Sequence, residues 1–234
     1  QMRALPWPRG SNLVLLIAMG GLGYVGQSFC YFAALQHASA GLTALLLYLY
    51  PAIVTVLSAL LARRRLSLPR MLAVATALLG TGLAVGGSLD GSVLGILLGV
   101  GAALIYSLYI LVGERVTPVT GAMPSATVIM LSAAMVYGLM VFWQGPAFPY
   151  SSTAWAAVGG IALFSTVVAI IAFFAGMARL GAADAATLST LEPVVTVVLA
   201  ALFLGEAVGG WQLAGGAIIL AAVIVLARSG EATA

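Results

Sequence analysis

One acidic residue stands deep inside an apolar stretch of the chain. Glu192 lies about eight residues into the stretch 184–204, where an ionised side chain costs at least ~2.5–3.5 kcal/mol in a bilayer. Ser189 and Thr196 stand three residues before it and four after it, so a helix would place all three on one polar face. Pro193 has no backbone N–H and would leave the carbonyl group of Ser189 free. The pattern indicates a proton-coupling or polar site that binds a proton or a substrate amine. The alternative is a protonated carboxyl group that only bonds that carbonyl group or a neighbouring helix.

Tyrosines and small residues recur at helical spacing in two further stretches. One face carries Gly20, Tyr24, Gln27 and Tyr31, and the other carries Gly95, Gly99, Ala102, Tyr106, Tyr109 and Gly113. Such a face can line a cavity, because a phenol ring offers a flat apolar surface with one hydroxyl group, or it can pack tightly against another helix. We expect a substrate cavity lined by Tyr24, Gln27, Tyr31, Tyr50, Tyr106 and Tyr109.

Few other side chains offer chemistry. The single histidine, His37, falls in a break between apolar stretches, and the single cysteine, Cys30, is best explained as a small packed residue. With one of each, the sequence indicates no metal site, no cofactor and no disulfide. It has no His-Glu-x-x-His run and no second acid deep inside an apolar stretch, so we predict no catalytic residues and no enzyme activity.

The composition decides which elements must position these residues. Of 234 residues, 63% are hydrophobic and 6% are charged, whereas roughly a quarter of the residues of a soluble domain are charged. Eight apolar stretches are about long enough to cross ~30 Å of hydrocarbon as helices. They cover residues 12–35, 41–62, 71–88, 93–113, 123–143, 154–178, 184–204 and 210–228. The expected fold class is an all-α integral membrane protein, a polytopic helical bundle with about eight transmembrane helices.

The basic residues predict the orientation in the membrane. Threading the chain through eight spans puts all nine arginines on one side: Arg3, Arg9, Arg63, Arg64, Arg65, Arg70, Arg115, Arg179 and Arg228. The other side receives Asp90 and Glu206, so the positive-inside rule makes the arginine side cytoplasmic, with the C-terminus inside. Topology and contact with anionic lipid explain these arginines, and we expect no nucleic-acid partner.

The chain repeats itself without a gap. Residues 11–89 match residues 153–231 at an offset of 142, which Leu49-Tyr50-Pro51 and Leu191-Glu192-Pro193 fix. The matched prolines, Pro51 and Pro193, would break both copies in mid-helix, and Tyr50 takes the place of Glu192. Repeats of this kind, with opposite orientations in the membrane, are typical of transporters, and paired interruptions often mark their binding site. A gentle kink without ligand contact is the alternative for each proline.

The second repeat unit is longer than the first. Five spans from about residue 92 form the second unit, and only three spans stand in the first. Projecting the offset back predicts about 50 further residues and two further helices before Gln1. We therefore expect an N-terminally truncated ten-helix protein. Residues 1–91 would be the last three helices of repeat one, and residues 92–234 the complete five-helix repeat two.

The two matched motifs resemble a known family. The segment Ala34 to Gly41 leading to Pro51, and Leu180-Gly181-Ala182-Ala183 leading to Pro193 and Leu204-Gly205-Glu206, are similar to the EamA-type repeats of the drug/metabolite transporter superfamily. The resemblance covers essentially the whole chain. It implies ten helices in two inverted five-helix units, cytoplasmic termini, and export of amino acids or other small metabolites. Arg64, which matches Glu206 in the first repeat, departs from the family pattern, because many members carry an acidic residue at that position.

Transport is the function that these features favour. We expect an inner-membrane, multi-pass exporter of a small-molecule substrate, such as an amino acid or a drug-like solute, that works by alternating access between two inverted repeats. Membrane lipid is the expected surrounding, and a homo-oligomer is compatible with the sequence. A small channel or a structural membrane subunit is the alternative, and an intramembrane enzyme is a more distant one.

Overall fold

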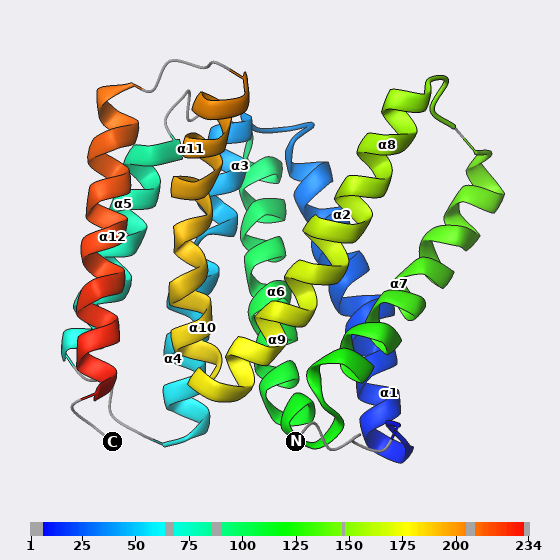
Figure 1. Cartoon of the computed structure of the whole chain (residues 1–234), viewed down its shortest axis with the longest axis horizontal. Coiled ribbons are helices and arrows are strands. Elements are labelled where there is room, and N and C mark those ends of the chain that lie inside the picture. Colours follow the sequence, from blue (N-terminus) through cyan, green and yellow to red (C-terminus); the bar gives the residue numbers. More distant parts are fainter. Residues whose placement is uncertain (1–6, 64–67, 86–89, 147, 205–208, 232–234) are drawn as a thin grey trace. The chain divides into compact units, whose positions relative to one another are not determined.

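Helices make up the structure. The computed structural model, drawn in Figure 1, describes residues 7–63, 68–85, 90–146, 148–204 and 209–231. Within these ranges the one extended pairing is an isolated bridge between Ala38 and Gly91. The elements in chain order are α1 (Gly10–Ala18), the π-helix η1 (Met19–Tyr24), α2 (Val25–Ala34), α3 (Ala40–Leu47), α4 (Tyr50–Leu61), α5 (Leu68–Val85), α6 (Val93–Thr120), α7 (Ala122–Gln144), α8 (Ser152–Gly160), the π-helix η2 (Ile161–Val168), α9 (Ala169–Leu180), α10 (Ala182–Leu188), the 3₁₀ turn η3 (Ser189–Leu191), α11 (Glu192–Leu204) and α12 (Gly210–Glu231).

The expected membrane fold is confirmed. In the described residues, five helical runs are long and apolar enough to cross a membrane: Gly10–Ala34, Ala40–Leu61, Val93–Thr120, Ala122–Gln144 and Ser152–Leu180. Two shorter apolar helices, Met71–Leu83 and Leu213–Ala222, fall in the predicted third and last spans. Arg3, Arg64, Arg65 and Glu206, which entered the topology prediction, lie outside the described residues.

One span is longer than its apolar stretch predicted. We expected a helix to residue 113, but α6 continues to Thr120. The charged residues Glu114 and Arg115 ended the apolar stretch, yet both are good helix formers, so a change in polarity is not a helix end. The helix ends at Gly121, whose φ of 84° suits glycine and turns the chain directly into α7.

The offset of 142 residues extends to the helices themselves. Helix α8 begins 142 residues after α1, η2 after η1, α10 after α3, and α11 after α4. Even the π-helical turns recur, with Met19 and Ile161 as their first residues. The internal repeat therefore includes the π-helical irregularities as well as the helix starts.

The two prolines lie where both repeats interrupt a span. Helix α3 ends at Leu47, Tyr48 and Leu49 form a turn, and α4 begins at Tyr50 with Pro51 next to it. In the second repeat, α10 passes into the 3₁₀ turn η3 before α11 begins at Glu192. Proline suits the first turn of a helix because the N–H that it lacks would have no partner there.

The chain forms two compact units that cut across the repeats. Unit 1 comprises Gln1–Gly26 and Tyr109–Gly181, and unit 2 comprises Gln27–Leu108 and Ala182–Ala234. Each unit thus takes segments from both sides of the predicted repeat boundary at residues 91 and 92. The repeats are units of sequence, and the division into 1–91 and 92–234 remains a prediction about sequence.

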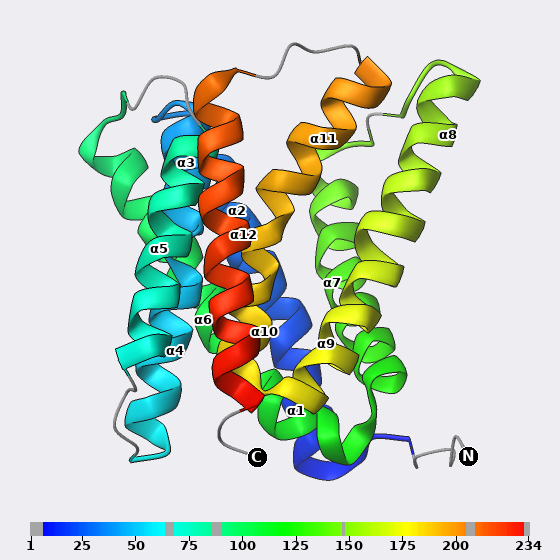
Figure 2. The same ribbon diagram turned by 60° about the vertical axis from the view of Figure 1, so that its left-hand side comes forward.

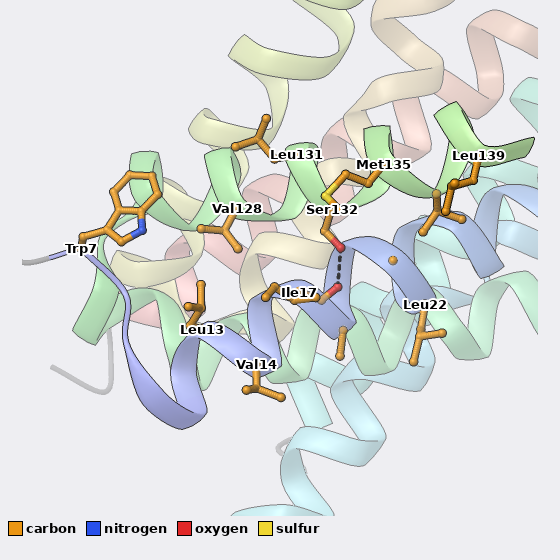
Figure 3. Close-up of a pocket in the computed structure, with 13 residues that line it drawn as sticks. Trp7, Leu13, Val14, Ile17, Leu22, Val128, Leu131, Ser132, Met135 and Leu139 are labelled. Carbon is orange, nitrogen blue, oxygen red and sulfur yellow. Dashed lines mark hydrogen bonds between the residues drawn. The ribbon is translucent and has the colours of Figure 1, made fainter. Parts of the chain in front are cut away.

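In unit 1, α7 packs along α1 and η1. The Ser132 hydroxyl group of α7 donates to the carbonyl oxygen of Ile17 at 2.7 Å. An apolar pocket of about 670 Å³ lies along this contact, bounded by side chains from Trp7 to Leu22 and from Val128 to Leu139 (Figure 3). In the same unit, Gly113 of α6 lies against Phe174 and Met177 of α9.

In unit 2, α5 and α12 lie side by side, as Figure 2 shows. A Cβ atom at Gly80 would lie 2.8 Å from the carbonyl oxygen of Gly215 and from a side-chain carbon of Ile219, so glycine allows this close approach. Helix α4 packs against α10, which brings the two interrupted spans together.

Candidate functional site

Tyr50 forms the centre of a polar cluster in unit 2. Its side chain is 3% exposed, and its hydroxyl group donates to the carbonyl oxygen of Ala186 at 3.4 Å. Its ring meets the ring of Tyr106 edge to face, with centroids 4.7 Å apart. Tyr50 therefore joins the break of the first repeat to the helix that precedes the break of the second.

Helix α6 supplies a further hydroxyl group to the same place. Ser107 is fully buried, donates to the carbonyl oxygen of Ala103 at 2.7 Å, and lies 3.4 Å from the carbonyl oxygen of Tyr50. Such a side chain keeps a backbone oxygen near the break in polar surroundings, where an unpaired carbonyl group would be costly.

Glu192 begins α11, and its side chain is exposed. The hydroxyl group of Tyr48, in the turn of the first repeat, donates a hydrogen bond to its carboxyl group. The N-terminus of a helix carries a partial positive charge that favours an anion. The phenol donor favours the charged form of Glu192, and partial desolvation of the carboxyl group opposes it.

The backbone at the second break is satisfied without the carboxyl group. The carbonyl oxygen of Ser189, which Pro193 was expected to free, accepts the backbone N–H of Glu192. Neighbouring hydroxyl groups donate to other carbonyl oxygens. The Thr187 hydroxyl group donates to the Ala183 oxygen at 2.8 Å, that of Ser189 to the Ala185 oxygen at 3.0 Å, and that of Thr190 to the Thr187 oxygen at 2.7 Å. The carboxyl group of Glu192 is therefore not required to repair the break, and its bond to Tyr48 of the neighbouring interrupted span is compatible with both a structural and a coupling role.

The other residues expected at a site fall in two groups. Tyr31 and Gln27 lie half-buried on α2 in unit 2, and Tyr31 is close enough to Glu192 to interact with it electrostatically. Ser189 lies within hydrogen-bonding reach of the Tyr50 hydroxyl group. The side chain of Thr196 lies outside the described residues.

Tyr24 and Tyr109 belong to unit 1. The Tyr109 side chain is 7% exposed, its ring lies 5.8 Å from that of Phe174, and it faces Gly23. Tyr109 thus packs in the core of unit 1.

Sequence reasoning missed Tyr48 and Ser107. Tyr48 carried a signal, since it stands two residues before Tyr50 and matches the buried Thr190 at the repeat offset. Ser107 carried no signal beyond its place next to Tyr106. Helical spacing alone does not tell which of two neighbouring helix faces packs against another helix.

The cluster carries groups that can exchange a proton and bind an amine. A carboxyl group with a phenol donor can take up a proton or pair with an amine, and the tyrosine rings offer faces for an apolar or cationic group. Among the described residues, no three His, Cys, Asp or Glu side chains gather as metal ligands.

Comparisons with known proteins agree with this architecture. The sequence pattern of the EamA-like transporter family matches residues 2–86 and again residues 93–228. The chain is 28% identical to the "Uncharacterized transporter YcbK" of Bacillus subtilis (strain 168), over 80% of the chain and 65% of that protein. An "Uncharacterized transporter" of Archaeoglobus fulgidus is also 28% identical, over 85% of the chain and 71% of that protein.

A solved structure has the same fold. A chain from a crystal structure described only as that of a protein superposes with a TM-score of 0.79 at 25% identity, covering 97% of the present chain and 77% of that one. The chain thus spans about two thirds to three quarters of the length of the proteins that it matches. The family match covers nearly all of it, and the chain belongs to the EamA-like transporter family.

Proposed function

We propose that the protein is a secondary transporter that exports a small organic solute, such as an amino acid, across the inner membrane. The observation that carries the proposal is the pair of interrupted spans in unit 2, which meet with Tyr50 at one break and Glu192 at the other. Interrupted helices of matching repeats are where transporters commonly bind substrate.

Glu192 is the proposed coupling residue. Its carboxyl group is exposed, hydrogen-bonded to Tyr48 and not needed by the backbone, so its charge can change without unfolding the break. A substrate amine or a proton would bind there in turn while the site alternates between the two sides of the membrane through the two repeats. Tyr31 and Tyr106 would orient the solute, and the buried Tyr50 would hold the two breaks together.

The arginines support a cytoplasmic C-terminus for the multi-pass chain. With export as proposed, the solute would bind from the side that bears the arginines and be released on the opposite side. Lipid surrounds the apolar helices, and the proposal needs no cofactor and no nucleic acid.

The experiment is transport in proteoliposomes made with the protein from its complete gene. An inward or outward proton gradient is imposed, and the fluxes of the twenty radiolabelled amino acids and of a set of cationic dyes are measured separately. Saturable flux of at least one solute that follows the proton gradient supports a carrier. Conductance that does not saturate would indicate a channel, and a chemically altered solute would indicate an enzyme.

A further inference from the structure

The apolar pocket of unit 1 lies between two runs that are long and apolar enough to cross a membrane. Side chains of α1 and η1 line one side of it, and side chains of α7 line the other. Its volume of about 670 Å³ lies within the ~300–1,000 Å³ that ligand sites commonly enclose. The pocket opens to its surroundings, because the lining residues Leu22 and Leu131 remain 75% and 59% exposed. A ligand can therefore enter it sideways from a membrane.

The wall of the pocket suits an apolar ligand. Among its lining side chains, only those of Trp7 and Ser132 carry a nitrogen or an oxygen atom. The hydroxyl group of Ser132 donates to the carbonyl oxygen of Ile17 at 2.7 Å, so its proton is already used within the wall (Figure 3). A polar group placed deep in the pocket would lose its hydrogen bonds to water and gain none. The ligand must therefore be apolar along its length.

The pocket is about as long as one leaflet of a bilayer is deep. On α1 and η1 it extends from Leu13 to Leu22, which is about 14 Å at 1.5 Å per residue. On α7 it extends from Val128 to Leu139, which is about 17 Å by the same measure. Half of the ~30 Å hydrocarbon core of a bilayer is about 15 Å. The dimensions thus fit one acyl chain of a single leaflet.

One end of the pocket carries an aromatic side chain and a positive charge. Trp7 lies at that end, before α1 begins, and is 53% exposed (Figure 3). Tryptophan is enriched where the apolar core of a membrane meets water. Arg9 follows two residues later as the N-cap of α1, and its side chain is also exposed. This end is therefore suited to the level of the lipid headgroups, on the side that bears the arginines.

We propose that the pocket binds one acyl chain of an anionic phospholipid whose phosphate group pairs with Arg9. The chain would lie along α1, η1 and α7, and the headgroup would lie at the level of Trp7. A guanidinium group can donate two parallel hydrogen bonds to a phosphate, and basic residues beside pockets between membrane helices bind anionic headgroups. The lipid site shares no residue with the cluster around Tyr50 and Glu192, so it stands or falls independently of the proposed transport.

Quenching of Trp7 fluorescence by brominated lipid tests the headgroup preference. In a background of Trp143→Phe, Trp155→Phe and Trp211→Phe, Trp7 is the only tryptophan of the sequence. The protein is reconstituted in mixtures of phosphatidylglycerol and phosphatidylcholine, with bromine close to the headgroup on the chains of one lipid or the other. Phosphatidylglycerol should bind beside Trp7 about fivefold more tightly, the equivalent of the ~1 kcal/mol that an arginine near an anionic lipid surface contributes.

Two arginine variants decide whether the preference belongs to this pocket. Arg9→Gln should remove the preference for phosphatidylglycerol. Arg115→Gln is the matched control, because Arg115 is exposed in the same unit and does not line the pocket, and it should leave the preference unchanged. Equal binding of the two lipids in the unaltered protein would overturn the proposal, and so would an equal loss in the two variants. Quenching that declines as the protein-to-lipid ratio rises would assign the pocket to a second copy and would also overturn it.

Filling the pocket provides a second test. Ala18 lines the pocket, so Ala18→Phe should displace the acyl chain and remove the preference for phosphatidylglycerol. Ala134→Phe is the matched control, because Ala134 is exposed on α7 and does not line the pocket. Ala18→Leu makes the same comparison with a smaller side chain, and the midpoint of SDS unfolding shows which variants are folded. A folded Ala18 variant that keeps the full preference would contradict the proposal.

Discussion

The two interrupted spans of unit 2 share a backbone plan and differ in the side chain at the break. Helices α4 and α11 both begin one residue before a proline, 142 residues apart. At the first break the residue is Tyr50, buried and bonded to the Ala186 carbonyl oxygen. At the second it is Glu192, exposed and bonded to the side chain of Tyr48.

The different side chains before the two prolines suggest two different tasks, one of packing and one of charge. Tyr50 holds the two spans together, since its ring and hydroxyl group contact α6 and α10. Glu192 is exposed, and the nearby carbonyl oxygens of Ser189 and Ala185 accept hydrogen bonds from other donors. Under the proposed function, the first break would hold the spans together, and the carboxyl group at the second would change its charge.

Exchanging the two side chains should give the largest difference between the two breaks in the free energy of unfolding. Tyr50→Glu should lower the free energy of unfolding by about 3–5 kcal/mol, because the buried ring is lost and a carboxyl group takes its place. Glu192→Tyr should change it by less than about 1 kcal/mol, because the side chain is exposed. Circular dichroism during titration of dodecyl maltoside micelles with SDS measures both. Equal destabilisation would contradict the division of tasks.

Replacing each proline should have a smaller and symmetrical effect. Pro51→Ala and Pro193→Ala should each lower the free energy of unfolding by roughly 0.4–1 kcal/mol, because proline is already suited to the first helical turn and restricts the unfolded chain. The same SDS titration serves. A gain of about 3 kcal/mol in either variant would show that the proline strains a helix that would otherwise be continuous.

The bond between Tyr48 and Glu192 should give the smallest effect. A double-mutant cycle of Tyr48→Phe and Glu192→Gln should return a coupling energy of about 0.6 kcal/mol, the average for hydrogen bonds between membrane helices. Tyr106→Phe replaces Tyr48→Phe in the control cycle. A coupling energy as large in the control cycle would mean that the two side chains interact only through the general packing of the cluster.

The sequence predicted the helices well because apolar length alone determines them. All eight expected stretches coincide with helical segments, and the prolines predicted both interruptions. The long α6 shows the limit of this reasoning, since Glu114 and Arg115 end the apolar stretch and continue the helix. The π-helical turns at Met19 and Ile161 had no sequence signal, because they depend on how the helix packs.

The site was predictable in its parts and not in its contacts. An acid within an apolar stretch and its matched tyrosine follow from the repeat, which selected Glu192 and Tyr50. Which group pairs with Glu192 depends on the position of the turn at Tyr48, and repeat spacing does not contain that information. The division into two compact units was also unpredictable, because it runs through the continuous helices α2 and α6 near Gly26 and Leu108.

The most direct test of the account is the pH dependence of solute flux in Glu192→Gln, in the protein from its complete gene, with Glu192→Asp as the conservative control. The account predicts that flux driven by a proton gradient falls at least about tenfold in Glu192→Gln, with the SDS unfolding midpoint unchanged, and that Glu192→Asp retains the pH dependence. Unchanged flux with an unchanged pH dependence in Glu192→Gln would contradict the coupling role of this carboxyl group.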